Sequence, residues 1–184
     1  MKEVIFAGFG GQGVLTAGLV LAYAAMEKDC NVSWMPAYGP EMRGGTANSC
    51  VKFGEAPGER SGTPTMNKAD AAVIMNIPSL KFLHFCRPGA TILINANTID
   101  RGVEIPEGYQ VVYVDSDALA HEVKNAKGTS IVMLGALTRL CGYFDKEHML
   151  ASMNKMFAEK GKSKFEELNV SAFEAGYRAV QKGS

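Results

Sequence analysis

The residues near the start of the chain that are best suited to chemistry form a glycine-rich turn, "GFGGQG", from Gly8 to Gly13. Its spacing matches G-x-G-x-x-G, the pattern of turns that bind a dinucleotide. An apolar run over Val4–Ala7 precedes this glycine turn, and a helical pattern rich in Ala and Leu follows it over Gln12–Glu27. We therefore expect a turn between a buried strand and a helix, whose first N–H groups form a natural anion site.

The glycines of the turn have expected roles. Gly8 and Gly10 free the backbone for a tight bend, and we expect Gly10 to take a conformation that a Cβ would disfavour. Gly13 is expected to let the helix pack closely against the sheet. Gly11 and Gln12 complete the candidate site.

A dinucleotide site also needs an acidic residue at the end of the second strand, where it holds the ribose hydroxyl groups. We expect this strand over Asn31–Met35, and Pro36, Ala37 and Tyr38 follow it. Asp29 lies before the strand, so the usual ribose contact is missing. An anion or phosphate site and a purely structural bend both remain open for the turn, whereas the missing acid argues against NAD.

A second candidate lies in the segment Pro36–Gly45, which is too rich in Pro and Gly for regular structure. The planar guanidinium of Arg43 suits two-point binding of a carboxylate or phosphate, whereas a Glu41–Arg43 contact would only stiffen the loop. We expect this loop and the glycine turn to meet at the C-terminal edge of the sheet, where ligands usually dock. The candidate residues of the loop are Tyr38, Gly39, Pro40, Glu41, Arg43 and Gly44.

The remaining patterns predict an α/β fold as a three-layer αβα sandwich, with a mainly parallel or mixed sheet and a Rossmann-like first βα unit. Because Val4–Ala7 and Ala71–Met75 are apolar throughout, they need cover on both faces, and we expect the first strand at the centre. We expect one domain over residues 1–184. Further strands are expected over 46–53, 69–76, 89–95 and 109–115, and helices over 117–124, 131–143, 146–159 and 165–181.

Composition argues against several classes of function. The chain has 19 basic and 19 acidic residues, so its charge gives no reason to expect binding to nucleic acid or to an anionic membrane. No apolar run reaches the roughly 18 residues of a membrane span. The four cysteines, at 30, 50, 86 and 141, are too scattered for a zinc or iron–sulfur site. We expect a reduced, cytoplasmic protein.

One predicted helix has almost no polar face. It lies in "SIVMLGALTRLCGYF", residues 130–144. A helix that is apolar on nearly every side is either central in its domain or covered by a partner. The sequence leaves both possibilities open.

Four motifs together resemble the gamma subunit of the 2-oxoacid:ferredoxin oxidoreductases. They are "GFGGQGV", "MPAYGPEMRGGTAN", "MNIPSLKF" and "LNVSAFEAGYRAV", they occur in the family's order, and they cover nearly the whole chain. Because Glu41 and Met42 precede Arg43, the long loop motif is most similar to that of the 2-oxoglutarate type. One departure is Ser130, in "SIVMLGA", where the family usually has Asn.

The resemblance implies a noncatalytic subunit of a larger enzyme, with alpha, beta and ferredoxin-like delta subunits as partners. That enzyme would decarboxylate a 2-oxoacid on thiamine diphosphate and magnesium. It would pass electrons through iron–sulfur clusters to ferredoxin or a similar acceptor and transfer the acyl group to coenzyme A. The resemblance implies no cofactor bound by this chain alone and no catalytic or metal-binding residue on it. Within that enzyme this chain would shape the subunit interface and the route by which coenzyme A approaches. The isolated chain is expected to self-associate.

The alternative function is a free-standing oxidoreductase domain that binds NAD or FAD at the glycine turn. We predict instead that the isolated chain binds neither NAD(H) nor FAD, because a diphosphate contact without the ribose clamp is too weak. Calorimetric titration at micromolar concentration checks this prediction. Saturable nicotinamide binding would contradict it and would favour the alternative function.

Overall fold

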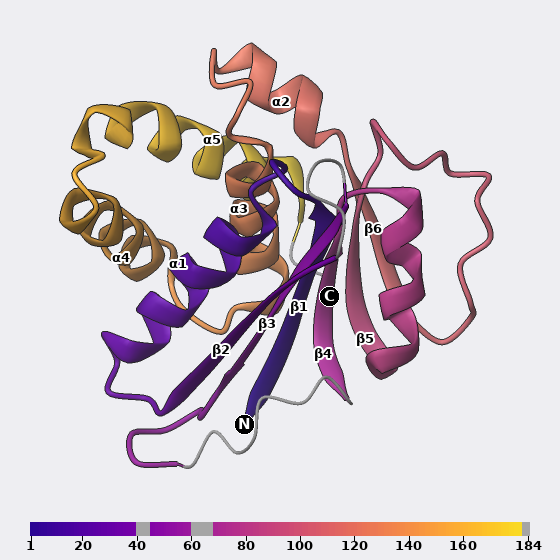
Figure 1. The fold of residues 1–184 in the computed structure, drawn as a ribbon, viewed down its shortest axis with the longest axis horizontal. Helices are drawn as coiled ribbons and strands as arrows, with labels where there is room; N and C mark the ends of the chain where they lie inside the picture. Colours follow the sequence, from indigo (N-terminus) through magenta and orange to yellow (C-terminus); the bar gives the residue numbers. More distant parts are fainter. Residues whose placement is uncertain (40–44, 60–67, 182–184) are drawn as a thin grey trace.

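A six-stranded sheet forms the centre of the computed structural model, which describes residues 1–39, 45–59 and 68–181 (Figure 1). The strand order is β2-β3-β1-β4-β5-β6. In chain order the strands are β1 (Lys2–Phe9), β2 (Val32–Tyr38), β3 (Thr46–Phe53), β4 (Ala69–Ile74), β5 (Cys86–Asn95) and β6 (Gln110–Val114).

The first strand lies inside the sheet, between β3 and β4, as its uniformly apolar sequence predicts. It pairs antiparallel with β3, where Val4 lies opposite Val51, and parallel with β4, where Val4 lies opposite Ala71. The pairs β4–β5 and β5–β6 are parallel, and β2–β3 is antiparallel. All strands described except β3 therefore run in one direction, which confirms a mainly parallel, mixed sheet.

The second strand is longer than its sequence indicates. Instead of ending at Met35, β2 continues through Pro36 to Tyr38, so the expectation that the irregular segment begins at Pro36 is wrong. Proline has no N–H to donate to a ladder and is tolerated mainly on edge strands. Because β2 pairs only with β3 and lies at the edge, Pro36 fits there opposite Ser49.

The α-helices cover one face of the sheet, as Figure 1 shows for α1, α3, α4 and α5. Their apolar side chains meet those of the strands in a core that includes Phe6, Leu93, Met133 and Phe173, all fully buried. The helices are α1 (Val14–Met26), α2 (Ser116–Glu122), α3 (Thr129–Cys141), α4 (Lys146–Glu159) and α5 (Glu166–Ala179). A short 3₁₀ helix, η2 (Ser163–Phe165), joins α4 to α5.

A 3₁₀ helix covers the other face. This helix, η1 (Ile77–Phe85), and the segment 96–109 pack on Ile5, Ile74 and Ile92. Asn76 caps η1 by accepting a hydrogen bond from the backbone N–H of Ser79 at 3.0 Å. In the described part of the chain the third layer therefore has one helix, η1, which the sequence patterns did not predict.

The apolar helix α3 is central in the domain, between the sheet and α5. Ideal Cβ atoms built on Gly135 and Gly176 would overlap the backbone carbonyls of Phe173 and Val132, respectively. The two helices therefore touch backbone to backbone, which only glycine allows. This crossing removes the need for a partner to cover α3.

Gly135→Ala should destabilise the protein by about 3 kcal/mol, because the new methyl group cannot fit against the Phe173 carbonyl without moving α5. Alanine favours an isolated helix by roughly 1 kcal/mol, so a loss of stability would report the crossing and not the helix itself. Denaturant unfolding measures the change. Gly10→Ala is the matched control, because the nearest atom to a Cβ at Gly10 is 3.9 Å away. Equal stability of the two variants would contradict the crossing.

Candidate functional site

The two sequence motifs meet at the C-terminal edge of the sheet. The N–H of Gly10 donates to the carbonyl of Gly45 at 3.0 Å, and the N–H of Gly39 donates to the carbonyl of Thr46 at 2.6 Å. Tyr38, at the end of β2, is 73% exposed. The glycine turn thus contacts the far end of the loop, while Pro40, Glu41, Arg43 and Gly44 lie outside the described residues.

The left-handed conformations of the turn belong to Gly11 and Gly13, with φ of 98° and 77°. Gly10 is not among the residues with positive φ, and a Cβ there would make only ordinary contact. The expectation that Gly10 needs a conformation disfavoured by a Cβ is therefore wrong. A sequence pattern gives the number of flexible positions in such a turn but not which of them carry the positive φ.

Gly13 allows a close approach, but not the one expected. A Cβ at Gly13 would overlap the Ser130 hydroxyl, so Gly13 brings the start of α1 against α3 and not against the sheet. Gly18, one turn further along α1, makes the close contact with the sheet, because a Cβ there would overlap Ser49 Oγ on β3. The hydroxyl of Ser49 also donates to the Val14 carbonyl at 3.1 Å.

Gln12 fixes the shape of the turn. Its Oε1 accepts hydrogen bonds from the backbone N–H of Phe9 at 2.7 Å and from Nδ2 of Asn76 at 3.1 Å. Its Nε2 faces the carbonyl of Met75 at 3.4 Å, and that carbonyl also accepts from Thr98 Oγ1 at 2.7 Å. The side chain therefore ties the turn to the residues that follow β4.

Asn76 belongs to this network and was missed at the sequence level. It is 3% exposed, and it caps η1 while it contacts Gln12. The signal was present in "MNIPS", because Asn before an early Pro is typical of a helix start. In the sequence analysis above, this motif supports the family resemblance but is not used to predict a helix start.

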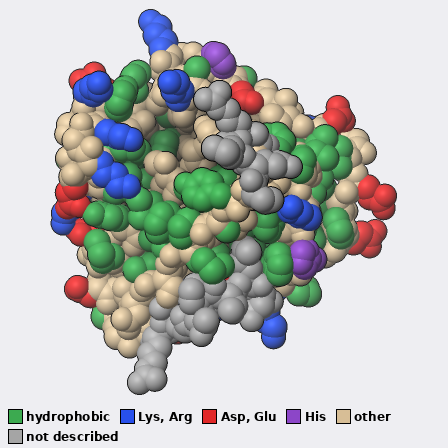
Figure 2. All heavy atoms as spheres, viewed as in Figure 1, with side chains coloured by type: hydrophobic (Ala, Val, Ile, Leu, Met, Phe, Trp, Pro, Cys, Tyr) green, Lys and Arg blue, Asp and Glu red, His purple; other side chains and the backbone are tan. Residues whose placement is uncertain are grey.

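Two hollows flank the start of α1, and both are lined by Gly11, Gly13 and Thr16. The smaller, of about 270 Å³, extends to Phe9 and Tyr38 and so joins the two sequence motifs. The larger, of about 570 Å³, lies between the start of α1, the α2–α3 connection and the segment from Lys162 to Asn169. We call the larger one the basic cavity. Figure 2 shows Lys and Arg side chains beside exposed hydrophobic ones at the upper left, where these helices lie in Figure 1.

The start of α1 is suited to an anion. Within the described residues no side chain caps this helix, whose N-cap is Gly13, so its first N–H groups have no side-chain partner there. The helix dipole adds partial positive charge at the same point. The anion interpretation of the turn is therefore consistent with the geometry, and the turn also serves as a close-packed bend.

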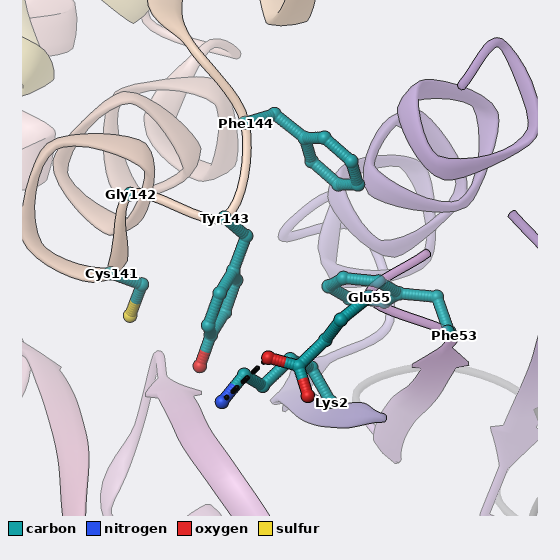
Figure 3. Close-up of a pocket in the computed structure, with 8 residues that line it drawn as sticks. Lys2, Phe53, Glu55, Cys141, Gly142, Tyr143 and Phe144 are labelled. Carbon is teal, nitrogen blue, oxygen red and sulfur yellow. Dashed lines mark ion pairs between the residues drawn. The ribbon is translucent and has the colours of Figure 1, made fainter. Parts of the chain in front are cut away.

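A further hollow, of about 310 Å³, lies at the opposite edge of the sheet (Figure 3). Its charged side chains neutralise each other, because Lys2 Nζ is 3.2 Å from Glu55. Burial raises the pKa of the Cys141 thiol to about 11, and burial also raises the pKa of the Tyr143 hydroxyl. Neither group is ionised at neutral pH, so this hollow offers no activated nucleophile or base.

Among the described residues there is no group of three or more His, Cys, Asp and Glu side chains that would hold a metal ion. The cysteines at 30, 50, 86 and 141 are all free thiols. Burial raises the pKa of Cys50 and of Cys86 to about 12, so these thiols are protonated at neutral pH. In the described parts of the chain, no helix has the length and apolar character needed to cross a membrane.

The fold and the site together define an α/β domain with a Rossmann-like first unit and a binding edge built on a glycine turn and an adjoining loop. The sequence profile of the pyruvate ferredoxin/flavodoxin oxidoreductase family matches residues 3–179, and the chain belongs to this family.

Relatives in this family differ in their named substrates. The chain is 37% identical to the ketoisovalerate oxidoreductase subunit VorA of Methanothermobacter marburgensis over 95% of its own length, but it spans only 35% of that subunit. It is 32% identical to the 2-oxoglutarate synthase subunit KorC of Methanocaldococcus jannaschii, over 98% of this chain and 94% of KorC. Among solved structures, it matches a keto/oxoacid ferredoxin oxidoreductase gamma subunit from Geobacter sulfurreducens. That match has a TM-score of 0.79 and 27% identity, over 97% of this chain and 98% of the other.

Gln12→Ala should lower the free energy of unfolding by about 2 kcal/mol, because it leaves the part-buried Phe9 N–H and the Asn76 amide without their acceptor. Chemical denaturation measures the loss, and amide hydrogen exchange at Phe9 locates it. Gln110→Ala, on the exposed start of β6, is the control and should change stability by less than about 0.5 kcal/mol. A Gln12 variant as stable as this control would mean that the turn holds its shape without the side chain.

Proposed function

We propose that this chain is the noncatalytic gamma subunit of a multi-subunit 2-oxoacid:ferredoxin oxidoreductase and acts as one domain over residues 1–184. The family match over residues 3–179, which includes both motifs of the C-terminal edge, carries the proposal. The likeness to a gamma subunit from Geobacter sulfurreducens over nearly the full length of both chains supports it.

In this proposal the chain contributes to ligand binding and to subunit assembly, and it carries out no catalytic step. The C-terminal edge offers backbone N–H groups and an uncapped helix start, which suit an anionic ligand or a partner's carboxylate. We assign this edge to the subunit interface and to the coenzyme A approach. The residues proposed for it are Gly8, Gly10, Gly11, Gln12, Gly13, Tyr38, Gly39, Pro40, Glu41, Arg43 and Gly44.

Partner chains would supply the remaining chemistry. In this proposal the alpha and beta subunits hold thiamine diphosphate and magnesium, the ferredoxin-like delta subunit holds iron–sulfur clusters, and ferredoxin or a similar protein accepts the electrons. Tyr38 is 73% exposed and Ile77, just after β4, is 54% exposed. Large apolar side chains exposed near one edge favour a partner surface there. The complex is proposed to be cytoplasmic, and the isolated chain to self-associate through this surface.

For the substrate, we propose 2-oxoglutarate, which the complex would convert to succinyl-CoA. The "YGPEMRGG" motif, residues 38–45, and the full-length likeness to KorC support this choice. The similarity to VorA supports ketoisovalerate as the competing substrate. Turnover of the assembled complex with each oxoacid decides between them.

Reconstitution of the complex with Arg43→Lys tests the role of the loop. The planar fork of arginine binds carboxylates and phosphates through two hydrogen bonds, and lysine reproduces this poorly. We expect a folded subunit with either weaker assembly or a coenzyme A requirement raised about tenfold, as one charge-assisted bond is worth roughly 1.5 kcal/mol. Size analysis and steady-state kinetics separate these two results.

Arg178→Lys is the matched control, because Arg178 is exposed on α5 and should leave both properties unchanged. If Arg43→Lys behaves like this control, the loop is only a rigid bend. If the wild-type chain joins no larger complex and stays monomeric at high concentration, the proposed subunit role fails.

A further inference from the structure

The strand β6 lies at one edge of the sheet, and its outer backbone groups have no partner in the described parts of the chain. Val114 pairs with Asn95, and its carbonyl accepts a hydrogen bond from the N–H of Ala96 at 2.9 Å, so the even-numbered residues of β6 bond to β5. The N–H and C=O groups of Val111 and Tyr113 therefore point away from the sheet. A row of open groups like this is a template for another strand.

The opposite edge of the sheet, β2, has a proline that interrupts this kind of template. At the end of β2, the N–H of Gly39 donates to the carbonyl of Thr46 at 2.6 Å. The odd-numbered residues of this strand therefore bond to β3, and the even-numbered residues point outward. Pro36 belongs to the outward row, where its missing N–H breaks the row of donors.

The strand β6 has none of these protective features. Its sequence, "QVVYV", contains no proline, glycine or charged residue. Its five residues are an ordinary strand length, and its register with β5 is continuous, without a bulge. The preceding segment, 96–109, packs on the face of the sheet that holds Ile5 and Ile92. Because native proteins protect edges that stay exposed, β6 is suited to pair with a strand from another chain.

Acidic residues flank β6 at both ends. Residues 96–122 contain six acidic side chains and one basic one, Arg101, which already lies over an aromatic ring. Glu107 precedes the strand and Asp115 follows it, and both are exposed and form no ion pair with a described residue. Figure 2 shows Asp and Glu side chains at the right edge of the molecule, where the segment 96–109 lies in Figure 1. This charge favours a basic partner.

We propose that β6 is a docking strand for a basic, extended segment of a partner protein, which adds a strand to this edge of the sheet. Backbone hydrogen bonds to Val111 and Tyr113 hold the segment in place. Glu107 and Asp115 attract Lys or Arg side chains near its two ends. The proposal does not depend on the proposed function, because it concerns an edge strand and not the glycine turn or its adjoining loop.

A second copy of this chain is a poor occupant of the edge. Two β6 strands related by a two-fold axis would pair antiparallel. With Val111 opposite its own copy, Glu107 of one chain would then lie beside Asp115 of the other. Like charges directly opposite each other destabilise a strand pair, so the flanking acids disfavour self-pairing and favour a basic segment.

Val111→Pro tests the edge directly. It removes an outward N–H without removing a hydrogen bond to β5, which is the arrangement that Pro36 already has in β2. Val111→Ala is the matched control, because it loses the same valine contacts but keeps the N–H. Both variants are expected to fold, and their NMR spectra check this.

The experiment is an NMR titration of the full chain at low concentration that follows the amide signals of Val111 and Tyr113. The probe is a short synthetic peptide in which threonine and valine alternate between terminal lysines. We expect saturable shifts of both signals and slower hydrogen exchange of both amides. The same peptide with terminal glutamates should bind about fivefold more weakly. The lysine peptide with methylated backbone nitrogens should not bind, because it cannot pair with a strand edge. Followed at Tyr113, Val111→Pro should bind the lysine peptide at least tenfold more weakly than Val111→Ala.

A charge variant keeps the test decisive if the proline variant does not fold. Glu107→Gln combined with Asp115→Asn should weaken binding of the lysine peptide about fivefold. Glu147→Gln combined with Glu167→Gln, on α4 and α5, is the charge-matched control and should bind like wild type.

The proposal is overturned if the lysine peptide causes no saturable change at Val111 and Tyr113, or if the methylated peptide binds equally well. It is also overturned if Val111→Pro binds as Val111→Ala does, or if the charge variant binds as its control does. Protection of these amides that grows with protein concentration, in the absence of peptide, would assign the edge to a second copy and would also overturn the proposal.

Discussion

The backbone contact between α3 and α5 at Gly135 and Gly176 determines how the helical face is arranged. Because the two helices cannot separate there without leaving a gap, α3 is held at a fixed height over the sheet. Its first turn then reaches the start of α1, where Ser130 packs against Gly13. The convergence of two helix starts on one cavity is therefore a consequence of a contact between helix interiors, well away from any ligand.

The C-terminal edge of the sheet combines rigidity with little chemical reactivity. Gln12 holds the turn through bonds to Phe9 and Asn76, so the N–H groups of the turn are already oriented before anything binds. The same edge has no described pair of acid and base within hydrogen-bond reach, and burial keeps the thiols of Cys50 and Cys86 protonated. An oriented but unreactive surface is suited to binding a ligand that reacts elsewhere.

Sequence patterns predicted the fold well where the burial of a segment can be inferred from the residues of that segment alone. The central place of Val4–Ala7 followed from its apolar character, and the strand at Thr46–Phe53 and the helix at Lys146–Glu159 have the predicted bounds. Errors arose where a neighbour decides the outcome. Pro36 is in a strand because that strand lies at an edge. For α3 the sequence left a central place and a partner's cover both open, and its contact with α5 decides for the central place. The basic cavity draws on α1, Lys124 and Lys162, which are far apart in sequence, and so no local pattern could reveal it.

The strand order also sets the sequence of events during synthesis. β1, α1, β2 and β3 are contiguous, so an antiparallel unit can assemble as soon as β3 has left the ribosome. The other side of β1 then presents an unpaired strand edge until β4 is made, since Val4 pairs with Ala71. The apolar side of α1 stays uncovered longer still, until α3 and α4 follow. The nascent domain therefore passes through an aggregation-prone stage that lasts for most of its translation, and rapid capture by chaperones would favour its yield.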